Sequence, residues 1–287
     1  MIPARFDYVR ADSLAGALRA LADAGEDAKV LAGGQSLLPL LRLRLAYPSV
    51  LVDIGRVAEL RGVREEGDRV VVGAMTTHYE VLRDPLVRQH LGLLAAATGT
   101  VADPAVRHRG TLGGSLAHAD PAGDLPAVAL ALDAELVVAG PSGRRSIPAE
   151  QFFLDYLETA LQPDELLVEV AFPKFTGWGY DYQKFQRVAQ AWAIVGVAAA
   201  VRREHGSVGE VRVGLTNMGP TPVRARQTEA ALAGAGLDAI RSAAESAAEG
   251  TNPAADLSAQ PDYRRHLARV LTRRALETAA GSVAAAG

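Results

Sequence analysis

Two short glycine-rich segments are the parts of this sequence best suited to bind a ligand. The first, Ala32-Gly33-Gly34-Gln35-Ser36, lies between an apolar stretch that predicts a strand and a leucine-rich stretch that predicts a helix. Backbone N–H groups at such a turn point outward and favour an anion. Paired glycines permit positive φ and leave no Cβ between backbone and ligand, and Ser36 adds a hydroxyl. The segment suits a phosphate, although such turns also serve as plain connections.

The second segment, Gly110-Thr111-Leu112-Gly113-Gly114-Ser115, repeats this chemistry further along the chain. Neither segment is a P-loop, because no Gly-Lys-Ser/Thr is present, and neither is the Gly-x-Gly-x-x-Gly of the Rossmann fold. Both nucleoside triphosphate hydrolysis and a conventional NAD fold therefore lose support. Two glycine loops from separate subdomains can instead grip one pyrophosphate from both sides, as an extended dinucleotide in a cleft requires. The alternative is two unrelated structural turns.

Other reactive side chains give weaker patterns. His108, His118, Asp120 and Asp124 are close in sequence but lack a known metal-ligand spacing, so we expect no metal site. Nothing fixes a substrate pocket between Asp120 and Asp124, so they do not predict an acid and base pair. The nucleophile motif Gly-x-Ser-x-Gly is missing. We therefore assign no catalytic residue.

The composition narrows the classes of protein. The 287 residues, 49% of them hydrophobic, are enough for two compact domains. A net charge of −3 argues against nucleic acid as a partner. No apolar run is long enough to span a bilayer, and the start of the sequence lacks the core of a signal peptide, so we expect a cytoplasmic protein. The sequence has no cysteine, so any cysteine-ligated iron–sulfur cluster must sit on another polypeptide.

The elements that must position the two segments alternate between helix and strand at first. The capping pair Asp12 and Ser13 predicts a helix, and the pattern then predicts strands at 28–32 and 50–54 around a helix at 37–45. This is a small α/β subdomain. A hairpin at 61–74 and helices from 76 to 97 follow, and residues 100–124 read as a long aperiodic loop. A helix at 125–132 and strands at 135–138, 145–147 and 166–172 complete this part.

A connection that contains two glycines and a tryptophan, at 174–179, predicts a domain boundary. Beyond it, residues 180–187, 194–202 and 208–214 predict three antiparallel strands, followed by alanine-rich helices. The expected fold is α+β. We expect a first domain at 1–175, with subdomains at about 1–56 and 57–175, and a smaller second domain at 178–287.

Two strings make a family resemblance specific. VLAGGQSLLPLL at 30–41 and RGTLGGSLAHADPAGDLPAVALAL at 109–132 resemble the two FAD-binding signatures of the medium subunit of molybdenum hydroxylases, such as carbon monoxide dehydrogenase and xanthine dehydrogenase. The resemblance continues through DELLVEVAFP, YQKF and RVAQAWAIVGVAAAV, so it covers nearly the whole chain. It implies an FAD-binding domain of the PCMH type, followed by a C-terminal domain of the carbon monoxide dehydrogenase flavoprotein type.

The resemblance also implies which residues hold the FAD pyrophosphate. The first loop and its flanks would bind one side: Val30, Leu31, Ala32, Gly33, Gly34, Gln35, Ser36 and Leu37. The second loop would bind the other side: Thr111, Leu112, Gly113, Gly114 and Ser115. Relatives often carry asparagine at the position of Ser115, so we expect the second loop to bind through its backbone.

Three further residues of the first domain carry over. Val101 would lie along the cofactor, Asp124 would accept a hydrogen bond from a hydroxyl or amine of FAD, and Leu166 would pack on it. Asp124 also has an alternative role as the N-cap of the helix that we expect to begin at Leu125.

Two residues of the second domain complete the implied site. Lys184 falls near the flavin, where a cation would stabilise the reduced anion, and the alternative is a solvated lysine on a strand. Trp192 falls next to the isoalloxazine, and the alternative is a tryptophan of the core. Relatives commonly carry an acidic residue just before it, where this chain has Ala191.

The resemblance implies a division of labour among subunits. This chain would receive electrons from a [2Fe–2S] small subunit and pass them through FAD to an external acceptor. A molybdopterin-binding large subunit would hydroxylate carbon monoxide, an aldehyde, a purine or another N-heterocycle, in a heterotrimer that dimerises. The alternatives are a stand-alone FAD-dependent oxidoreductase and a non-catalytic assembly subunit that has lost FAD.

Overall fold

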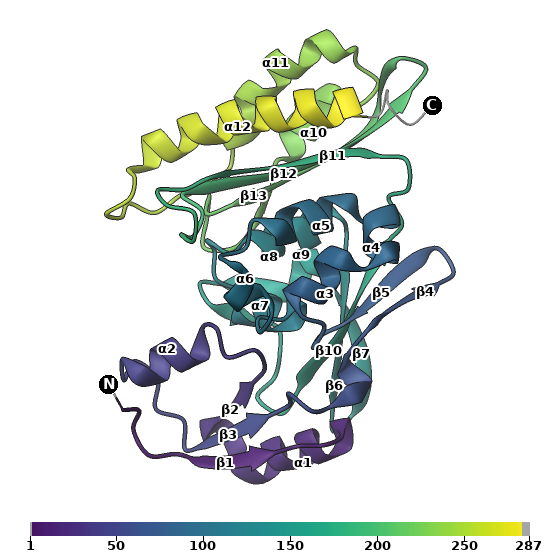
Figure 1. Ribbon diagram of the computed structural model, residues 1–287. Helices are drawn as coiled ribbons and strands as arrows, with labels where there is room; N and C mark the ends of the chain where they lie inside the picture. The colour runs from purple at the N-terminus through teal and green to yellow at the C-terminus, as the bar shows by residue number, and fades with distance from the viewer. Residues whose placement is uncertain (1, 283–287) are drawn as a thin grey trace.

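The computed structural model describes residues 2–282, which form three stacked units (Figure 1). A small parallel sheet lies at the N-terminal end, a five-stranded antiparallel sheet with helices lies in the middle, and a second antiparallel sheet with helices forms the C-terminal end. The expected α+β class is confirmed.

The N-terminal unit combines a small parallel sheet with two helices. Its sheet has the order β1-β3-β2 and is parallel throughout, with strands β1 Asp7–Arg10, β2 Ala28–Leu31 and β3 Val50–Asp53. Its helices are α1 Leu14–Ala24 and α2 Leu37–Arg42, and short 3-10 turns follow α1 at Gly25–Asp27 and β3 at Ala58–Leu60. Ser13 caps α1 by accepting a hydrogen bond from the N–H of Gly16, as the sequence predicts. Helix α2 ends at Arg42, three residues before the predicted end.

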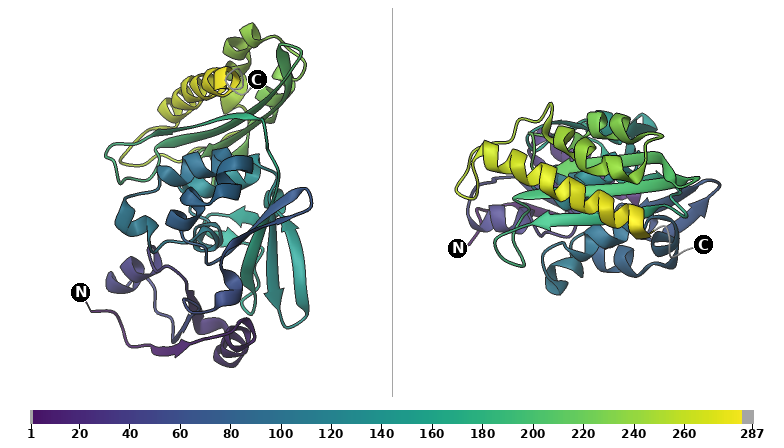
Figure 2. Two further views of the ribbon diagram at one scale, coloured as in Figure 1. Left: turned by 45° about the vertical axis from the view of Figure 1, so that its right-hand side comes forward. Right: turned by 90° about the horizontal axis from the view of Figure 1, so that it is seen from above.

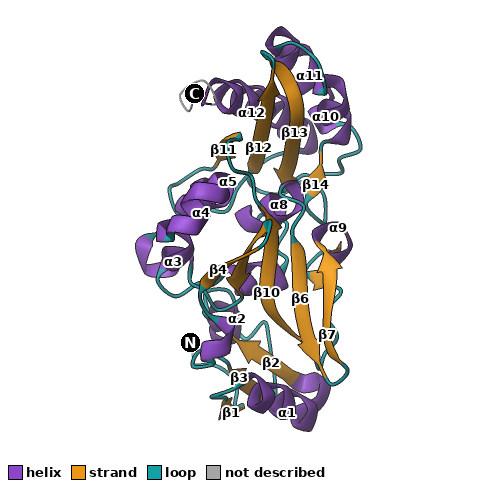
Figure 3. Cartoon of the chain, turned by 90° about the vertical axis from the view of Figure 1, so that its right-hand side faces the viewer, coloured by secondary structure: helices purple, strands orange, loops and turns teal. Residues whose placement is uncertain are grey.

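The middle unit is built on a sheet of order β4-β5-β10-β6-β7, antiparallel throughout (Figure 3). The predicted hairpin at 61–74 forms its edge. The strands are β4 Val63–Glu66, β5 Arg69–Gly73, β6 Glu135–Gly140, β7 Gly143–Pro148 and β10 Leu166–Pro173, with a separate small ribbon of β8 Phe153–Asp155 and β9 Glu158–Thr159. The helices are α3 His78–Arg83, α4 Pro85–His90, α5 Gly92–Gly99, α6 Pro104–Arg107, α7 Leu112–His118, α8 Asp124–Ala131 and α9 Ala149–Phe152.

The prediction of a long aperiodic loop at 100–124 was wrong. Two short helices, α6 and α7, lie within it. Asp103 caps α6 by accepting from the N–H of Val106, and Thr111 caps α7 by accepting from the N–H of Gly114. Helices this short do not repeat often enough to show a period in the sequence, so only their caps mark them.

The C-terminal unit is a sheet of order β11-β12-β13-β14 with helices on one face (Figure 2). The three predicted strands form β11 Gly179–Phe185, β12 Val195–Glu204 and β13 Ser207–Thr216, and a two-residue strand, β14 Val223–Arg224, is added at the edge. Helix α12 crosses the outer face of the sheet. The helices are α10 Arg226–Leu232, α11 Ile240–Ala243 and α12 Pro261–Ser282, with 3-10 turns at Leu237–Ala239 and Ala244–Ala248. The expected domain continues to residue 287, and 283–287 lie outside the described residues.

The inner face of this sheet packs directly on α8 of the middle unit. A Cβ on Gly214 of β13 would lie 2.3 Å from the carbonyl oxygen of Ala127, so only glycine allows this approach. Tyr182 and Ala198 of the sheet belong to the same buried cluster as Leu125 of α8. The middle and C-terminal units therefore share one hydrophobic core.

Candidate functional site

The first glycine loop leaves its backbone donors free. It leads from β2 into α2, and Gly34 has a φ of +75°, which glycine adopts at little cost. Within residues 2–282, no group of the chain accepts a hydrogen bond from the N–H groups of residues 33–37. The Gln35 side chain donates back to the Gly33 carbonyl, 3.0 Å away, and the Ser36 hydroxyl makes no capping bond. This run of amide donors suits an anion.

The second loop differs, because it is the first turn of α7. The N–H groups of Leu112 and Gly113 donate to the carbonyls of Thr76 and Ala74, at 3.1 and 2.8 Å. The N–H of Gly114 donates to the Thr111 hydroxyl oxygen, 3.0 Å away. The N–H of Ser115 donates to the Thr111 carbonyl. The loop therefore offers a ligand the hydroxyls of Thr111 and Ser115, and its backbone amides at 112–115 are already bonded.

The two loops touch each other. A Cβ on Gly33 would lie 2.2 Å from the Arg109 carbonyl oxygen and 2.8 Å from the Cα of Gly110. A Cβ on Gly114 would lie 3.6 Å from the Cβ of Ala32. The structure thus brings together the two segments that the sequence singled out. It also corrects the expected explanation for a glycine at position 33. This glycine is required by the backbone of the second loop, whereas we had expected it to make room for a ligand.

His78 supports the second loop from behind. Its N–H donates to the Gly110 carbonyl at 2.9 Å, and a Cβ on Gly110 would lie 2.8 Å from its ring. Burial, and to a smaller extent the charge of Arg107, lowers the pKa of His78 from 6.5 to about 4. The imidazole is therefore neutral at pH 7.

Asp124 and Lys184 form a buried ion pair between α8 and β11. The Lys184 Nζ lies 2.8 Å from Asp124 Oδ2, and these side chains are 5% and 3% exposed. The Tyr182 hydroxyl donates to the other carboxylate oxygen, at 2.6 Å. Burial raises the pKa of Asp124, which the Lys184 ammonium and the Tyr182 hydroxyl partly offset, and burial raises the pKa of Tyr182 well above its usual 10.0.

This geometry overturns both alternative roles. Helix α8 begins at Asp124 with Gly123 at its N-cap, and the carboxylate makes no capping bond. The predicted start at Leu125 and the N-cap role of Asp124 were therefore wrong. Lys184 is not a solvated strand lysine. Tyr182 was missed, although residues two apart on a strand share a face, so the position of Lys184 pointed to it.

The ion pair also holds the segment that contains Val101. Lys184 donates a second hydrogen bond to the Thr100 carbonyl, at 3.2 Å. Arg107, for which the sequence gave no signal, donates to the Val101 carbonyl at 2.8 Å. Val101 itself is partly buried against the main core. One ammonium thus links α8, β11 and the turn at 100–103.

Trp192 lies on the loop that joins β11 to β12. Its side chain is 55% exposed, so the alternative of a core tryptophan was wrong. On the same loop, the Gln190 amide donates to Asp103 Oδ2 of the middle unit, at 2.8 Å. The tryptophan is therefore presented at the surface beside the turn at 100–103.

Leu166 stands apart from these residues. It begins β10, and its side chain is 3% exposed in the core between the N-terminal and middle units, with Val52 and Met75. The structure does not bring this side chain to the surface that carries the loops. Val30 and Leu31 lie in β2 and lead into the first loop, and Leu37 begins α2.

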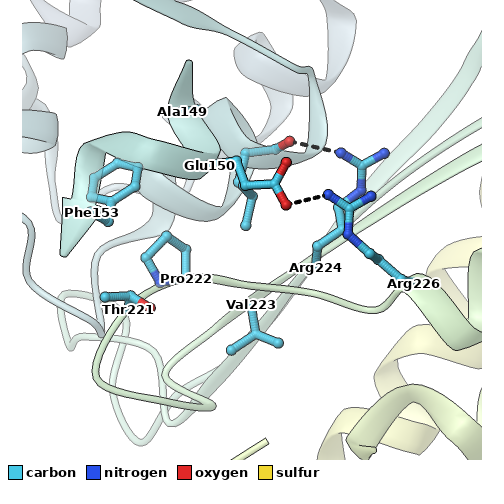
Figure 4. Close-up of a pocket in the computed structure, with 9 residues that line it drawn as sticks. Ala149, Glu150, Phe153, Thr221, Pro222, Val223, Arg224 and Arg226 are labelled. Atoms are coloured by element: carbon cyan, nitrogen blue, oxygen red, sulfur yellow. Dashed lines mark hydrogen bonds and ion pairs between the residues drawn. The ribbon is translucent and has the colours of Figure 1, made fainter. Parts of the chain in front are cut away.

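A cavity of about 300 Å³ lies elsewhere, between α9 and residues 221–226 (Figure 4). Phe153 and Pro222 line it, and the Glu150–Arg226 ion pair, 2.6 Å long, stands at one side. None of the predicted site residues lines it. In the part of the chain that the structure describes, no group of three or more acidic, histidine or cysteine side chains is placed to hold a metal. No helix there is long and apolar enough to cross a membrane.

Comparison with known proteins identifies the family. Residues 4–175 match the model of the FAD binding domain in molybdopterin dehydrogenase, and residues 180–279 match that of the CO dehydrogenase flavoprotein C-terminal domain. The chain belongs to the FAD-binding medium subunits of the molybdenum hydroxylases. It is therefore an FAD-binding flavoprotein and part of an oxidoreductase complex, as the sequence predicted.

The relatives match this chain along nearly their whole length. The carbon monoxide dehydrogenase medium chain of Hydrogenophaga pseudoflava is 43% identical over 282 residues, covering 97% of this chain and 98% of its own. The xanthine dehydrogenase FAD-binding subunit of Escherichia coli O157:H7 is 31% identical, covering 98% and 97%. The solved structure of carbon monoxide dehydrogenase from Hydrogenophaga pseudoflava superposes with a TM-score of 0.95 at 45% identity, covering 97% and 98% of the two chains.

Proposed function

We propose that this medium subunit takes electrons one at a time from a [2Fe–2S] small subunit and delivers them in pairs to an external acceptor. The free amides at residues 33–37 carry the proposal, because they are the donors that a pyrophosphate requires. Bound FAD supplies the exchange between one- and two-electron chemistry. Substrate hydroxylation belongs, in this proposal, to a molybdopterin-binding large subunit, in a heterotrimer that dimerises.

The two loops take different parts of the pyrophosphate in this proposal. The amides of residues 33–37 donate to its oxygens, and the hydroxyls of Thr111 and Ser115 donate from the other side. The contact between Gly33 and the backbone of Gly110 supports this division, because it places both loops at one point. Ser115 thus contributes its side chain.

Near the flavin we assign orienting roles to Asp124, Lys184 and Trp192. An ammonium has three donors, and Lys184 uses two of them on Asp124 and Thr100, so one is left for the cofactor. Asp124 offsets the lysine charge, so the pair presents a dipole and no net charge to the flavin. Trp192 covers the isoalloxazine from its exposed loop, and Val101 borders it from the turn that Lys184 holds.

The test begins with the absorbance of the purified full-length chain. We expect flavin bands near about 375 and 450 nm and release of FAD on denaturation. We then add the reduced [2Fe–2S] subunit of the same complex under anaerobic conditions and follow bleaching of the band near about 450 nm. Bleaching only when that subunit is present supports the proposal. Direct reduction by a small-molecule substrate without it, or a folded chain that takes up no FAD, contradicts the proposal.

A further inference from the structure

The loop that carries Trp192 changes abruptly from exposed to buried. The Trp192 side chain is 55% exposed, and the next two residues, Ala193 and Ile194, are 2% and 6% exposed. The base of this loop, its stem, is closed by a hydrogen bond from the N–H of Ile194 to the Phe185 carbonyl, at 2.8 Å. The position of the tryptophan therefore depends on what holds Ala193 and Ile194.

Asn217 holds the first of these two residues. Its side-chain amide donates to the Ala193 carbonyl at 2.8 Å, and its own N–H donates to the Pro121 carbonyl at 2.8 Å. Its φ is +62°, a conformation that asparagine tolerates better than most residues. Asn217 thus ties the tryptophan loop to the segment that runs from the second glycine loop to Asp124.

Arg264 of α12 holds the second of these residues, Ile194. Its guanidinium is 1% exposed, and it donates from Nη1 to the Ile194 carbonyl and from Nη2 to Asp256 Oδ2, the latter at 2.6 Å. Its Nε has no acceptor within residues 2–282. Burying an arginine costs stability unless its partners compensate, and apolar residues build a core at lower cost. A buried cation that binds a loop carbonyl therefore indicates a role in positioning that loop.

We propose that Asn217 and Arg264 are positioning residues that fix the successive carbonyls of Ala193 and Ile194 and thereby hold the Trp192 ring in one orientation toward the flavin. Two donors from separate elements fix both the place and the direction of a short segment, which a single hydrogen bond does not. Side chains that contact a ligand need this kind of support to stay in productive geometry. The orientation toward flavin rests on the proposed function, whereas the anchoring rests on the contacts alone.

The anchoring is tested without flavin. The chain has two tryptophans, so Trp178→Phe leaves Trp192 as the only one. In this background Asn217→Gly removes the side-chain donor but keeps the backbone N–H and allows the positive φ. We expect the amplitude of fast depolarisation in time-resolved fluorescence anisotropy of the apoprotein to rise roughly twofold, because a released loop moves on the nanosecond timescale. Arg264→Met should give a similar rise, and Arg264→Lys an intermediate one.

Two control variants separate anchoring from general destabilisation. Thr228→Val removes a buried hydrogen bond to the Ala243 carbonyl, 3.2 Å long, and Thr272→Val changes a buried hydroxyl on α12 that has no partner in the described chain. Neither should raise the depolarisation. If Arg264 variants do not fold, Asn217→Gly decides the question alone. Unchanged anisotropy in folded Asn217→Gly, or an equal rise in Thr228→Val, would overturn the anchoring.

The orientation is tested on the FAD-loaded chain by visible circular dichroism of the flavin. We expect Asn217→Gly to shift the flavin signal toward that of Trp192→Ala at equal FAD content, with Thr228→Val unchanged. A signal that does not respond to Trp192→Ala overturns the orientation toward flavin. A wild-type chain that binds no FAD contradicts the proposed function instead, and the anisotropy result still decides the anchoring.

Discussion

The two glycine-rich loops have similar residues but use their backbones differently. The amides of residues 33–37 have no acceptor among the described residues, whereas those of residues 112–115 are all bonded within the chain. The difference comes from the neighbours. The second loop is held against the connection between β5 and α3 by bonds to the carbonyls of Ala74 and Thr76, whereas the first loop makes no such bonds with its amides within the described chain. Free amides therefore depend on tertiary surroundings that a glycine motif does not encode.

The contact between α8 and β11 differs from both loops because it carries a buried ion pair. Lys184→Met would leave the Asp124 carboxylate buried without its cation, at a cost of about 3–5 kcal/mol in the free energy of unfolding. We expect FAD to be lost as well. Urea unfolding and flavin content measure both effects. Lys174→Met is the matched control, because its partner Glu65 is 48% exposed, and it should change stability much less. Equal effects of the two substitutions would contradict the role of the buried pair.

Contact between the loops is broken most directly at Gly33. Gly33→Ala places a Cβ 2.2 Å from the Arg109 carbonyl oxygen, so the loops must separate at a cost of about 2–3 kcal/mol. Retention of FAD during gel filtration should fall with it. Gly99→Ala is the control, since its Cβ would lie 3.7 Å from Leu82, an ordinary contact in a helix. A Gly33→Ala protein with normal stability and full flavin would show that the loops need not touch.

Acid should destabilise the protein through His78, which supports the second loop. The folded pKa of His78, about 4, is below its unfolded value of 6.5, so the unfolded state binds the proton first as pH falls. The contribution of the neutral His78 to the free energy of unfolding is complete above pH 6.5 and is lost between pH 6.5 and 4. The loss amounts to about 2 kcal/mol by pH 5. Denaturant unfolding at pH 7.5 and pH 5 measures the loss, and His78→Gln should remove that part of it. The same pH dependence in this variant would assign the loss to other groups.

The smallest expected effect comes from removing the hydroxyl of Ser115 in the second loop, compared with that of Ser36 in the first. If the second loop binds through hydroxyls, Ser115→Ala should weaken FAD binding by about 1 kcal/mol, roughly fivefold. Ser36→Ala should change it less, because the amides around Ser36 remain. Titration of the apoprotein with FAD gives both dissociation constants. A larger loss for Ser36→Ala would reverse the assignment.

Local patterns predicted the fold well where the elements were long enough to repeat. The cap at Ser13, the hairpin at 61–74 and the strands of the C-terminal sheet are all present. Helices α6 and α7 were missed because each is too short to show a period. The clash that makes Gly33 necessary involves residues 109 and 110, and this proximity has no local signature.

The sequence named candidate residues for the site, and the structure adds the environments of their side chains. The resemblance pointed to Asp124, Lys184 and Trp192. It did not give the ion pair between the first two, because sequence does not reveal which buried charges meet across a domain contact. An exposed tryptophan in an apolar stretch likewise looks like a core residue until the stem bonds of Asn217 and Arg264 are known.

The close approach of Gly214 to the Ala127 carbonyl bears on how the gene can be divided. The two family models meet between residues 175 and 180, so that segment looks like a natural point for recombination. However, a fragment cut there would expose the face of α8 that packs on β13. Exchange of C-terminal halves between relatives therefore requires that α8 and β13 be exchanged together, because their backbones are in close contact.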